Sequence, residues 1–507
     1  MRNPNMENPI LLYISLALIF ILFLLKLLQF SNSRTNQKLP PSPTGRLPLI
    51  GHLHLLKHPI HRTLHGLSLK YGPILSLRFG SRLVFLVSSP SIAEECFTTN
   101  DVVLANRPRL LMGKYIGYNN TTMVASPYGS HWRNLRKIGS IEIFSNHRIN
   151  MFSSIRKDEV KRLLCRLGRD SRGGFTKVEL KSVFTDLTLN NMMRMVAGKR
   201  YCGDGTNNEE EAMEFKEILA GVIKLGSASH PGDFLPILNW FGHSFEKKLK
   251  KMGERMDRFL QCLIDEKRNN GGGNTMIDHL LTLQQSKPEY YTDEVIKGLI
   301  LVILSAGTDT ISITIEWALS NLLNHRDALI KARIEIDTQV GQNRLIDESD
   351  FSNLQYLQNI IFETLRLYPP APLLIPHMSS NHCIINGYDM PPNTILMTNA
   401  WTIHRDPEIW EEPLKFNPDR FRNDEVDAEK LIMPFGLGRR TCPGAGLAQR
   451  MVCLTLGSLI QCFEWERINE EEINMEEGKG ITMSKLKPLE ALCKARPIIN
   501  ELMEDVD

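Results

Sequence analysis

Hydrophobic residues fill one stretch near the start of the chain and recur with a helical period after it. Ile10 to Phe30 is almost entirely apolar and is broken late by Lys26 and Gln29. A run of this length can cross a bilayer as one helix. A signal peptide is the alternative, but no small-residue cleavage site follows the run. Basic residues such as Arg34 lie at or after its end, so we expect an uncleaved, single-pass anchor with the rest of the chain in the cytosol.

The remaining pattern of apolar and polar positions is typical of a mostly helical protein. Apolar residues spaced three and four apart predict helices, the longest over 293–323. A short hairpin is predicted from 75–79 and 83–87, with Gly80-Ser81 as its turn. The sequence therefore predicts a mainly α fold with a small β portion. Other predicted helices cover 152–167, 215–225, 245–267 and 445–462.

A proline-rich stretch, Leu39 to Gly51, separates the apolar run from these helices. Proline at this density stiffens an extended linker. We expect three parts: a membrane anchor over 1–30, a hinge over 31–51 and one large domain over 52–507.

Composition excludes several other classes of protein. The 507 residues are 42% hydrophobic and carry a net charge of only +3, which argues against a nucleic-acid-binding protein. Nine cysteines form no C-x-x-C pair, which argues against a zinc site or a disulfide framework and fits a reducing compartment.

One cysteine stands in a glycine-bounded loop just before a predicted helix. The loop, Phe435 to Gly444, reads Phe-Gly-Leu-Gly-Arg-Arg-Thr-Cys-Pro-Gly. A thiolate at Cys442 would face the unpaired N–H groups at the helix start, which stabilise an anion and tune an attached metal. A buried structural cysteine is the simpler alternative. A dinucleotide loop at 444–449 is rejected, because Gln449 replaces the third small residue.

This loop resembles the haem-binding loop of the cytochrome P-450 monooxygenases. Phe435, Gly438, Arg440, Cys442 and Gly444 fit the family pattern, and a long motif in context outweighs a short one. The resemblance implies that Cys442 is the axial ligand of haem b (iron protoporphyrin IX), that Phe435 contributes to the haem site, and that Arg440 pairs with an anionic haem edge. It also implies the cytochrome P-450 fold, with 52–507 as the haem-thiolate domain.

Two further stretches match the family in the expected order. Trp132 and Arg136 are four residues apart on one predicted helix face and would contact a haem propionate. The segment 306–310, Ala-Gly-Thr-Asp-Thr, places an acid beside an alcohol in an apolar helix. Thr310 would hydrogen-bond the activated dioxygen, and Asp309 would relay protons from solvent. The alternative for Thr310 is a helical threonine bonded back to its own helix.

Other residues carry roles that the resemblance alone implies. Glu363, Arg366 and Arg420 would form a structural triad that holds the haem loop. His377 occupies a position often used for a propionate. The substrate chamber would be lined by Ala306, Leu373, Leu374 and Met483.

The implied activity is that of a monooxygenase in the endoplasmic reticulum membrane. It would take O2 and electrons from NADPH through the cytochrome P-450 reductase and would oxidise a small lipophilic substrate. The chain resembles plant microsomal members, among them isoflavone ring hydroxylases and lignan methylenedioxy-bridge enzymes, and related members oxidise terpenoids. A haem-thiolate isomerase or dehydratase that needs no reductase, or a non-catalytic haem-binding protein, is the alternative. The Asp309-Thr310 pair argues against the isomerase, which needs no proton delivery to dioxygen.

Overall fold

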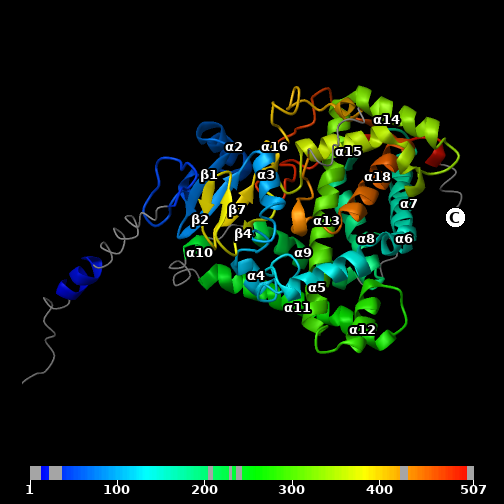
Figure 1. Ribbon diagram of the computed structural model, residues 1–507. Helices are drawn as coiled ribbons and strands as arrows, with labels where there is room; N and C mark the ends of the chain where they lie inside the picture. Colours follow the sequence, from blue (N-terminus) through cyan, green and yellow to red (C-terminus); the bar gives the residue numbers. More distant parts are fainter. Residues whose placement is uncertain are drawn as a thin grey trace, which may run out of the picture.

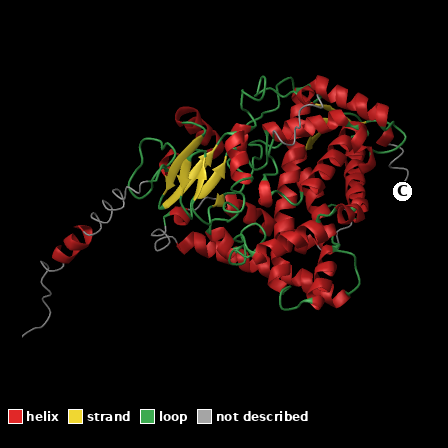
Figure 2. Ribbon diagram, in the orientation of Figure 1, coloured by secondary structure: helices red, strands yellow, loops and turns green. Residues whose placement is uncertain are grey.

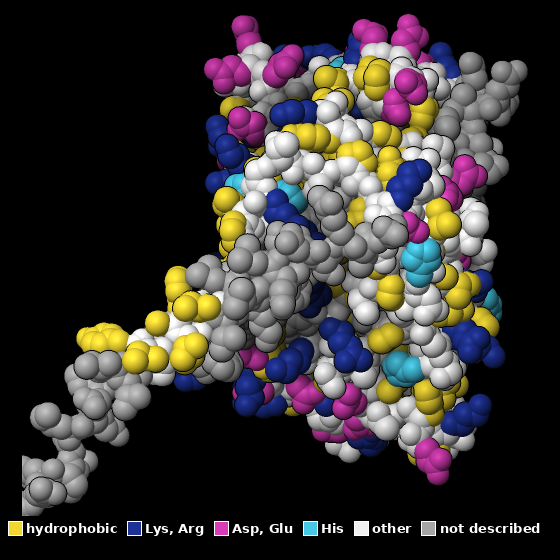
Figure 3. Space-filling view, turned by 60° about the vertical axis from the view of Figure 1, so that its left-hand side comes forward, with side chains coloured by type: hydrophobic (Ala, Val, Ile, Leu, Met, Phe, Trp, Pro, Cys, Tyr) yellow, Lys and Arg dark blue, Asp and Glu magenta, His cyan; other side chains and the backbone are white. Residues whose placement is uncertain are grey.

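A long central helix, α13 (Asp293–Asn324), runs through a body of helices, and a small sheet lies at one end (Figures 1 and 2). The computed structural model describes residues 13–21, 37–203, 209–227, 231–235, 243–422 and 432–499. Most of the predicted anchor therefore lies outside the described residues. Residues 13–21 are helical, and their apolar side chains are exposed (Figure 3).

The sequence of α13 explains its central position. The Thr292 hydroxyl accepts the N–H of Val295, and two acidic residues in the first turn face the positive end of the helix dipole. The rest is apolar nearly all round and buried, as in a core helix. Among the described residues it is the one helix long and apolar enough to cross a membrane, but 72% of its apolar window is buried in the protein.

One large hydrophobic core forms around this helix. It is built with α7 (Ser153–Asp170), α8 (Leu180–Ala197), α15 (Gln355–Leu367) and α18 (Ala445–Cys462). The predicted helix 445–462 matches α18 residue for residue. The predicted helices 152–167, 215–225 and 245–267 lie within or close to α7, α9 (Glu209–Ser227) and α11 (His243–Asn270). Their ends extend further, because polar end turns carry no apolar periodicity.

The predicted hairpin is confirmed as β1 (Ile74–Phe79) and β2 (Arg82–Val87), which pair antiparallel. Gly80 takes the left-handed conformation that the tight turn requires, with φ of +57°. β2 then pairs parallel with β7 (Ile395–Thr398), and β7 pairs antiparallel with β4 (His377–Met378). The short strand β4 thereby brings His377 towards the middle of the molecule.

Two small sheets and several further helices complete the described fold. The sheets are β3 (Thr176–Glu179), β9 (Glu490–Ala495) and β8 (Phe463–Glu466), in that order, and β5 (Cys383–Ile385) with β6 (Tyr388–Met390). The helices are α2 (Ile60–Tyr71), α3 (Pro90–Phe97), α4 (Leu111–Tyr115), α5 (Ser130–Ile138), α6 (Asn146–Met151), α10 (Pro231–Phe234), α12 (Met276–Ser286), α14 (Arg326–Gln339) and α16 (Ala400–Ile403).

Candidate functional site

The cysteine loop is held in one shape by its backbone. The N–H of Cys442 donates to the carbonyl oxygen of Phe435 over 2.8 Å, which closes the loop. Gly438 has a φ of +67°, and a Cβ there would lie 2.8 Å from the carbonyl oxygen of Phe97. A side chain at Gly438 would therefore force the loop away from α3. The loop leads directly into α18, whose first residue is Ala445.

The Cys442 thiol faces a large internal cavity. Its side chain is accessible from that cavity, while protein surrounds it on the other sides. Burial raises the pKa of the thiol, and the Gly444 N–H and the Arg136 guanidinium act in the opposite direction. A thiolate here needs a positive partner in the cavity, because a buried anion is otherwise costly. A bound metal ion is such a partner.

The cavity lies between the cysteine loop and α13 and is mostly apolar. α13 contributes Val302, Ile303, Ala306, Gly307 and Thr310. Further apolar walls come from the loop before α5, from α8 and from the segment after α15. These residues are Met123, Val124, Met192, Pro370, Ala371, Leu374 and Ile375.

Positive charge gathers along one edge of the cavity. The guanidinium carbon of Arg440 lies 4.3 Å from the centroid of the Trp132 ring. The Nε of Arg440 donates to the carbonyl oxygen of Ala105 over 2.7 Å. Burial lowers the pKa of Arg440 to about 9. Arg136 donates to the carbonyl oxygen of Thr441 over 2.6 Å and so ties α5 to the cysteine loop. The predicted pair Trp132 and Arg136 does lie on the cavity wall, as do Phe435 and Arg440.

His377 and Arg107 complete this edge. His377 donates from Nδ1 to the carbonyl oxygen of Leu104 over 2.8 Å. Burial lowers the pKa of His377 well below its ordinary value, and the nearby charge of Arg107 lowers it further. Both effects favour the neutral ring. Sequence reasoning missed Arg107, which has no local motif. Its Nη1 donates to the carbonyl oxygens of Ile375 and Pro376, while its buried Nε has no partner.

These features fit iron protoporphyrin IX. The walls are apolar, a thiol opens into the cavity, and the edge offers three guanidinium groups. The unpaired Nε of Arg107 is costly in a buried position unless an anion accepts from it, and carboxylate groups are suitable acceptors. Cys442 could hold the iron, and Arg107, Arg136 and Arg440 could hold the carboxylates.

The predicted acid and alcohol of α13 point in different directions. Thr310 lines the cavity, and its Oγ1 donates to the carbonyl oxygen of Ala306 over 2.7 Å. The bond back to the helix, considered as an alternative above, is thus present. Asp309 does not line the cavity. Its carboxyl is buried, Oδ2 has no partner, and burial raises its pKa despite a hydrogen bond with Thr482.

The predicted structural triad is brought together behind the site. Glu363 and Arg366 are completely buried and form a bidentate pair at 2.7 and 2.8 Å. Arg420 Nε donates to Glu363 Oε1 over 3.0 Å. Arg366 also donates to the carbonyl oxygens of His404 and Pro413. The triad therefore joins α15 to the two segments that precede the cysteine loop.

Of the four residues predicted to line a substrate chamber, the structure places two at the cavity. Ala306 and Leu374 line it. Leu373 does not, because it packs into the small core around β1 and β2. Met483 is buried elsewhere, and its carbonyl oxygen accepts from Trp317 Nε1 over 2.7 Å. These two assignments to the cavity wall are therefore corrected.

Known proteins resemble the chain over almost its whole length. The family model described as cytochrome P-450 matches residues 40–492. Cytochrome P-450 81Q32 from Catharanthus roseus is 56% identical over 99% of this chain and 100% of the relative. Isoflavone 3'-hydroxylase from Medicago truncatula is 54% identical over 97% and 99%, and (+)-piperitol/(+)-sesamin synthase from Sesamum radiatum is 52% identical over 98% and 99%.

Proposed function

This chain belongs to the cytochrome P-450 family of haem monooxygenases, and we propose that it oxidises a lipophilic plant phenolic compound with an isoflavonoid or lignan-type ring system. The observation that carries the proposal is the apolar cavity between α13 and the Cys442 loop. The wall that α13 contributes offers hydrocarbon surface and threonine hydroxyl groups and no charged side chain, which suits a flat, neutral ring system.

The residues of the chain divide the work as follows. Cys442 would hold the iron, and Arg107, Arg136 and Arg440 would hold the carboxylates, with His377 and Trp132 beside them on the cavity wall. When bound, the haem supplies dioxygen activation, which a thiolate ligand favours. Ala306 and Gly307 leave room next to Thr310, and Leu374 limits the position of the substrate ring from the opposite wall.

Thr310 and Asp309 are the two residues of α13 that we assign to proton delivery. Thr310 Oγ1 holds a proton that it now donates to the carbonyl oxygen of Ala306, and a small rotation redirects that donor into the cavity. Burial raises the pKa of Asp309, so its carboxyl keeps a proton to higher pH than an exposed aspartate does. The cavity wall is mostly apolar, so Thr310 is the α13 hydroxyl next to Ala306 and Gly307 that can pass a proton into it.

Electrons come from the NADPH-dependent reductase in the endoplasmic reticulum membrane. Arg133 and Lys137 are exposed on α5, the helix that carries Arg136 towards the thiol side of the cavity. This pair suits an acidic electron donor. The apolar segment 10–30 anchors the protein, with 31–51 as a hinge and 52–507 as the catalytic domain.

A spin-state screen tests the proposal. Purified full-length protein is titrated with an isoflavone aglycone, a furofuran lignan and a terpenoid, and the products formed with reductase and NADPH are identified. We expect an isoflavone or lignan to shift the haem spectrum and to consume NADPH with product formation. A terpenoid that alone does both would overturn the assignment of the substrate class.

A further inference from the structure

The aromatic ring of Phe144 lies beside the Cys442 loop on the wall of the cavity. A Cβ at Gly444 would lie 3.6 Å from Cε1 of Phe144 and 3.9 Å from its Cζ, and the same point is 3.9 Å from the Cys442 Sγ. The outer edge of the ring and the sulfur therefore border one small space at Gly444. Neither the cysteine motif nor the proton groups of α13 account for this aromatic side chain.

The chain reaches Phe144 through a wide turn. α5 ends at Ile138, and residues 139–143 continue as one π-helical turn. The N–H of Phe144 closes this turn by donating to the carbonyl oxygen of Gly139 over 2.8 Å. Turns of this kind are frequent at functional sites. Ser145, the N-cap of α6, follows at once, so Phe144 is fixed between two helical segments.

A hydrogen-bond network holds this turn from the outside. His279 of α12 contacts Glu142 of the turn through Nε2 over 2.6 Å, and its Nδ1 accepts from Arg148 of α6 over 2.8 Å. Because a guanidinium group only donates, Nδ1 carries no proton and Nε2 donates to the carboxylate. α12 therefore ties together the segments on both sides of Phe144.

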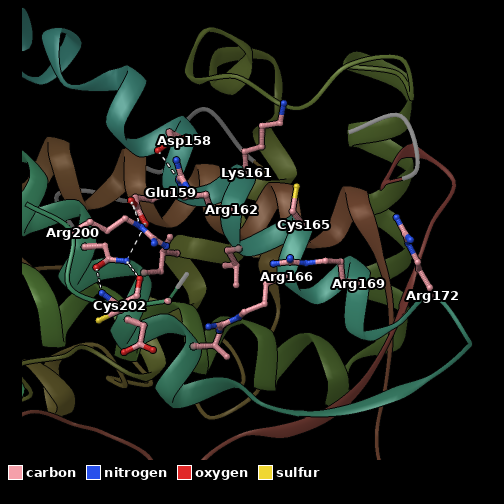
Figure 4. A pocket seen from close by; sticks show the side chains of 16 residues that line it. Asp158, Glu159, Lys161, Arg162, Cys165, Arg166, Arg169, Arg172, Arg200 and Cys202 are labelled. Atoms are coloured by element: carbon pink, nitrogen blue, oxygen red, sulfur yellow. Dashed lines mark hydrogen bonds and ion pairs between the residues drawn. The ribbon is translucent and has the colours of Figure 1, made fainter. Parts of the chain in front are cut away.

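α6 and the helix after it are also fixed to the rest of the body. Arg450 of α18 donates to the side chain of Asn146 at the start of α6 over 3.4 Å. α7, which follows α6, is bound to the segment after α8, because the buried carboxylate of Glu159 pairs with Arg200 over 2.9 Å (Figure 4). The support behind Phe144 therefore comes from several helices, which keeps the ring in place against the cysteine loop.

The groups around a thiolate ligand influence the metal that it holds. The Gly444 N–H already acts on the Cys442 sulfur as a hydrogen-bond donor. Hydrogen bonding and burial around the ligand tune the reduction potential of a haem, and an apolar shell limits the access of water. The phenyl ring of Phe144 offers no donor, and it borders the space at Gly444 where a water molecule would otherwise meet the sulfur.

We propose that Phe144 is a positioning residue of the haem site, which keeps water and other donors away from the Cys442 sulfur and thereby sets the reduction potential of the bound haem. This role rests on the proposed bond between Cys442 and the iron. Loss of the apolar cover adds a hydrogen bond to the sulfur, weakens its donation to the iron and raises the potential.

Two substitutions of similar size separate polarity from packing. Phe144→Gln places an amide N–H near the sulfur, whereas Phe144→Leu keeps the cover apolar. Spectroelectrochemical titration of the full-length holoprotein measures the reduction potential, and the reduced carbon monoxide complex reports the thiolate. We expect Phe144→Gln to raise the ratio of ferrous to ferric haem at the wild-type midpoint by about threefold or more, and to move the carbon monoxide band to shorter wavelength. Phe144→Leu should stay close to the wild type.

Phe152→Gln is the matched control. Phe152 is a buried phenylalanine at the other end of α6 and does not line the cavity. Its substitution should lower the free energy of unfolding without moving the reduction potential. An equal shift in Phe152→Gln would overturn the role of Phe144, and so would equal potentials for Phe144→Gln and Phe144→Leu.

Phe144→Tyr is the milder variant if Phe144→Gln does not retain haem. It adds one hydroxyl group at the edge of the ring, and an unchanged potential in this variant also counts against the proposal. The wild-type spectrum separates the two assignments. A wild type without the thiolate band would refute the iron–Cys442 bond and this role with it, whereas a normal band with unchanged potentials in the Phe144 variants would refute the role of Phe144 alone.

Discussion

Lys297 of α13 and Asp257 of α11 form an ion pair of 2.5 Å that links these two helices. Tyr118 donates its hydroxyl to the same Asp257 oxygen over 3.0 Å. Tyr118, Asn119 and Asn120 all have positive φ angles, which are strained for residues with side chains. Asp257 thus holds a strained loop, whose next residues include Met123 of the cavity wall, against two helices.

Asp257→Asn should release this loop. The variant leaves the partly buried ammonium of Lys297 without its counter-charge, so we expect the free energy of unfolding in urea to fall by about 1–3 kcal/mol. Amide exchange of residues 116–126 should also become faster. Asp265→Asn on the same helix is the control, because its pair with Arg268 is exposed and should contribute little. Equal effects of the two changes would show that Asp257 does not hold the loop.

Cys442→Ser should abolish the red-shifted absorbance of the reduced carbon monoxide complex. That band requires a thiolate on iron, and a serine hydroxyl is too weak a ligand to replace it. Absorbance spectroscopy of purified protein measures the result. Cys262→Ser changes an exposed cysteine on α11 and should leave the spectrum intact. A normal band in the Cys442 variant would rule out this residue as the iron ligand.

Thr310→Ala should keep the haem but separate NADPH consumption from product formation. Without the hydroxyl, protons are delivered poorly, and we expect the ratio of product to NADPH to fall by about tenfold or more while peroxide accumulates. Thr308→Ala is the matched control. Thr308 makes the same kind of bond, to the carbonyl oxygen of Leu304, but does not line the cavity. Unaltered coupling in the Thr310 variant would contradict its role with protons.

Two aspartates of α13 should respond to pH in opposite directions. Burial raises the pKa of Asp309 above 3.8 in the folded state. The free energy of unfolding of the wild type therefore decreases as pH rises from 3.8 to this raised pKa. Asp309→Asn never ionises, and we expect it to be more stable than the wild type at pH 7, with the difference vanishing towards pH 4. Urea unfolding at several pH values measures both. An Asp309→Asn variant that is less stable than the wild type at pH 7 would contradict the raised pKa of Asp309.

Asp293 provides the opposite sign in the same helix. Burial alone would raise the pKa of Asp293, but hydrogen bonds from Arg268, Gln284 and Gln261 outweigh it and lower the pKa to about 2. Its contribution is present above pH 3.8 and is lost as pH falls towards 2. Asp293→Asn should therefore cost about 1–2 kcal/mol at pH 7, reduced for partial exposure, and less in acid.

Sequence reasoning succeeded where the determinants are local. Trp132 and Arg136 share a face because a helix repeats every 3.6 residues, and Gly80 marks a turn because glycine tolerates a positive φ. It failed where placement depends on distant packing. Leu373 and Leu374 are neighbours, yet only Leu374 reaches the cavity, because Leu373 turns into the core beside β1.

Arg107 shows what a sequence pattern cannot reveal. Its neighbours Asn106 and Pro108 form no recognisable motif, and its importance depends on carbonyl oxygens 268 and 269 residues away. Adjacent helical residues lie about 100° apart around the axis, so Asp309 and Thr310 must point in different directions, but the sequence does not say which of them faces the cavity. Only the assembled fold shows that the alcohol faces the cavity and the acid does not.

The unsatisfied Nε of Arg107 predicts that the protein is less stable before haem binds than after, because a buried donor without a partner is costly. A chain made when haem is scarce keeps the Arg107 N–H buried without an acceptor, so we expect it to unfold and be degraded more readily until haem is inserted. Cellular yield should then follow the rate of tetrapyrrole synthesis, and feeding a precursor such as 5-aminolevulinate to an expression host should raise the amount of full-length protein as well as its colour.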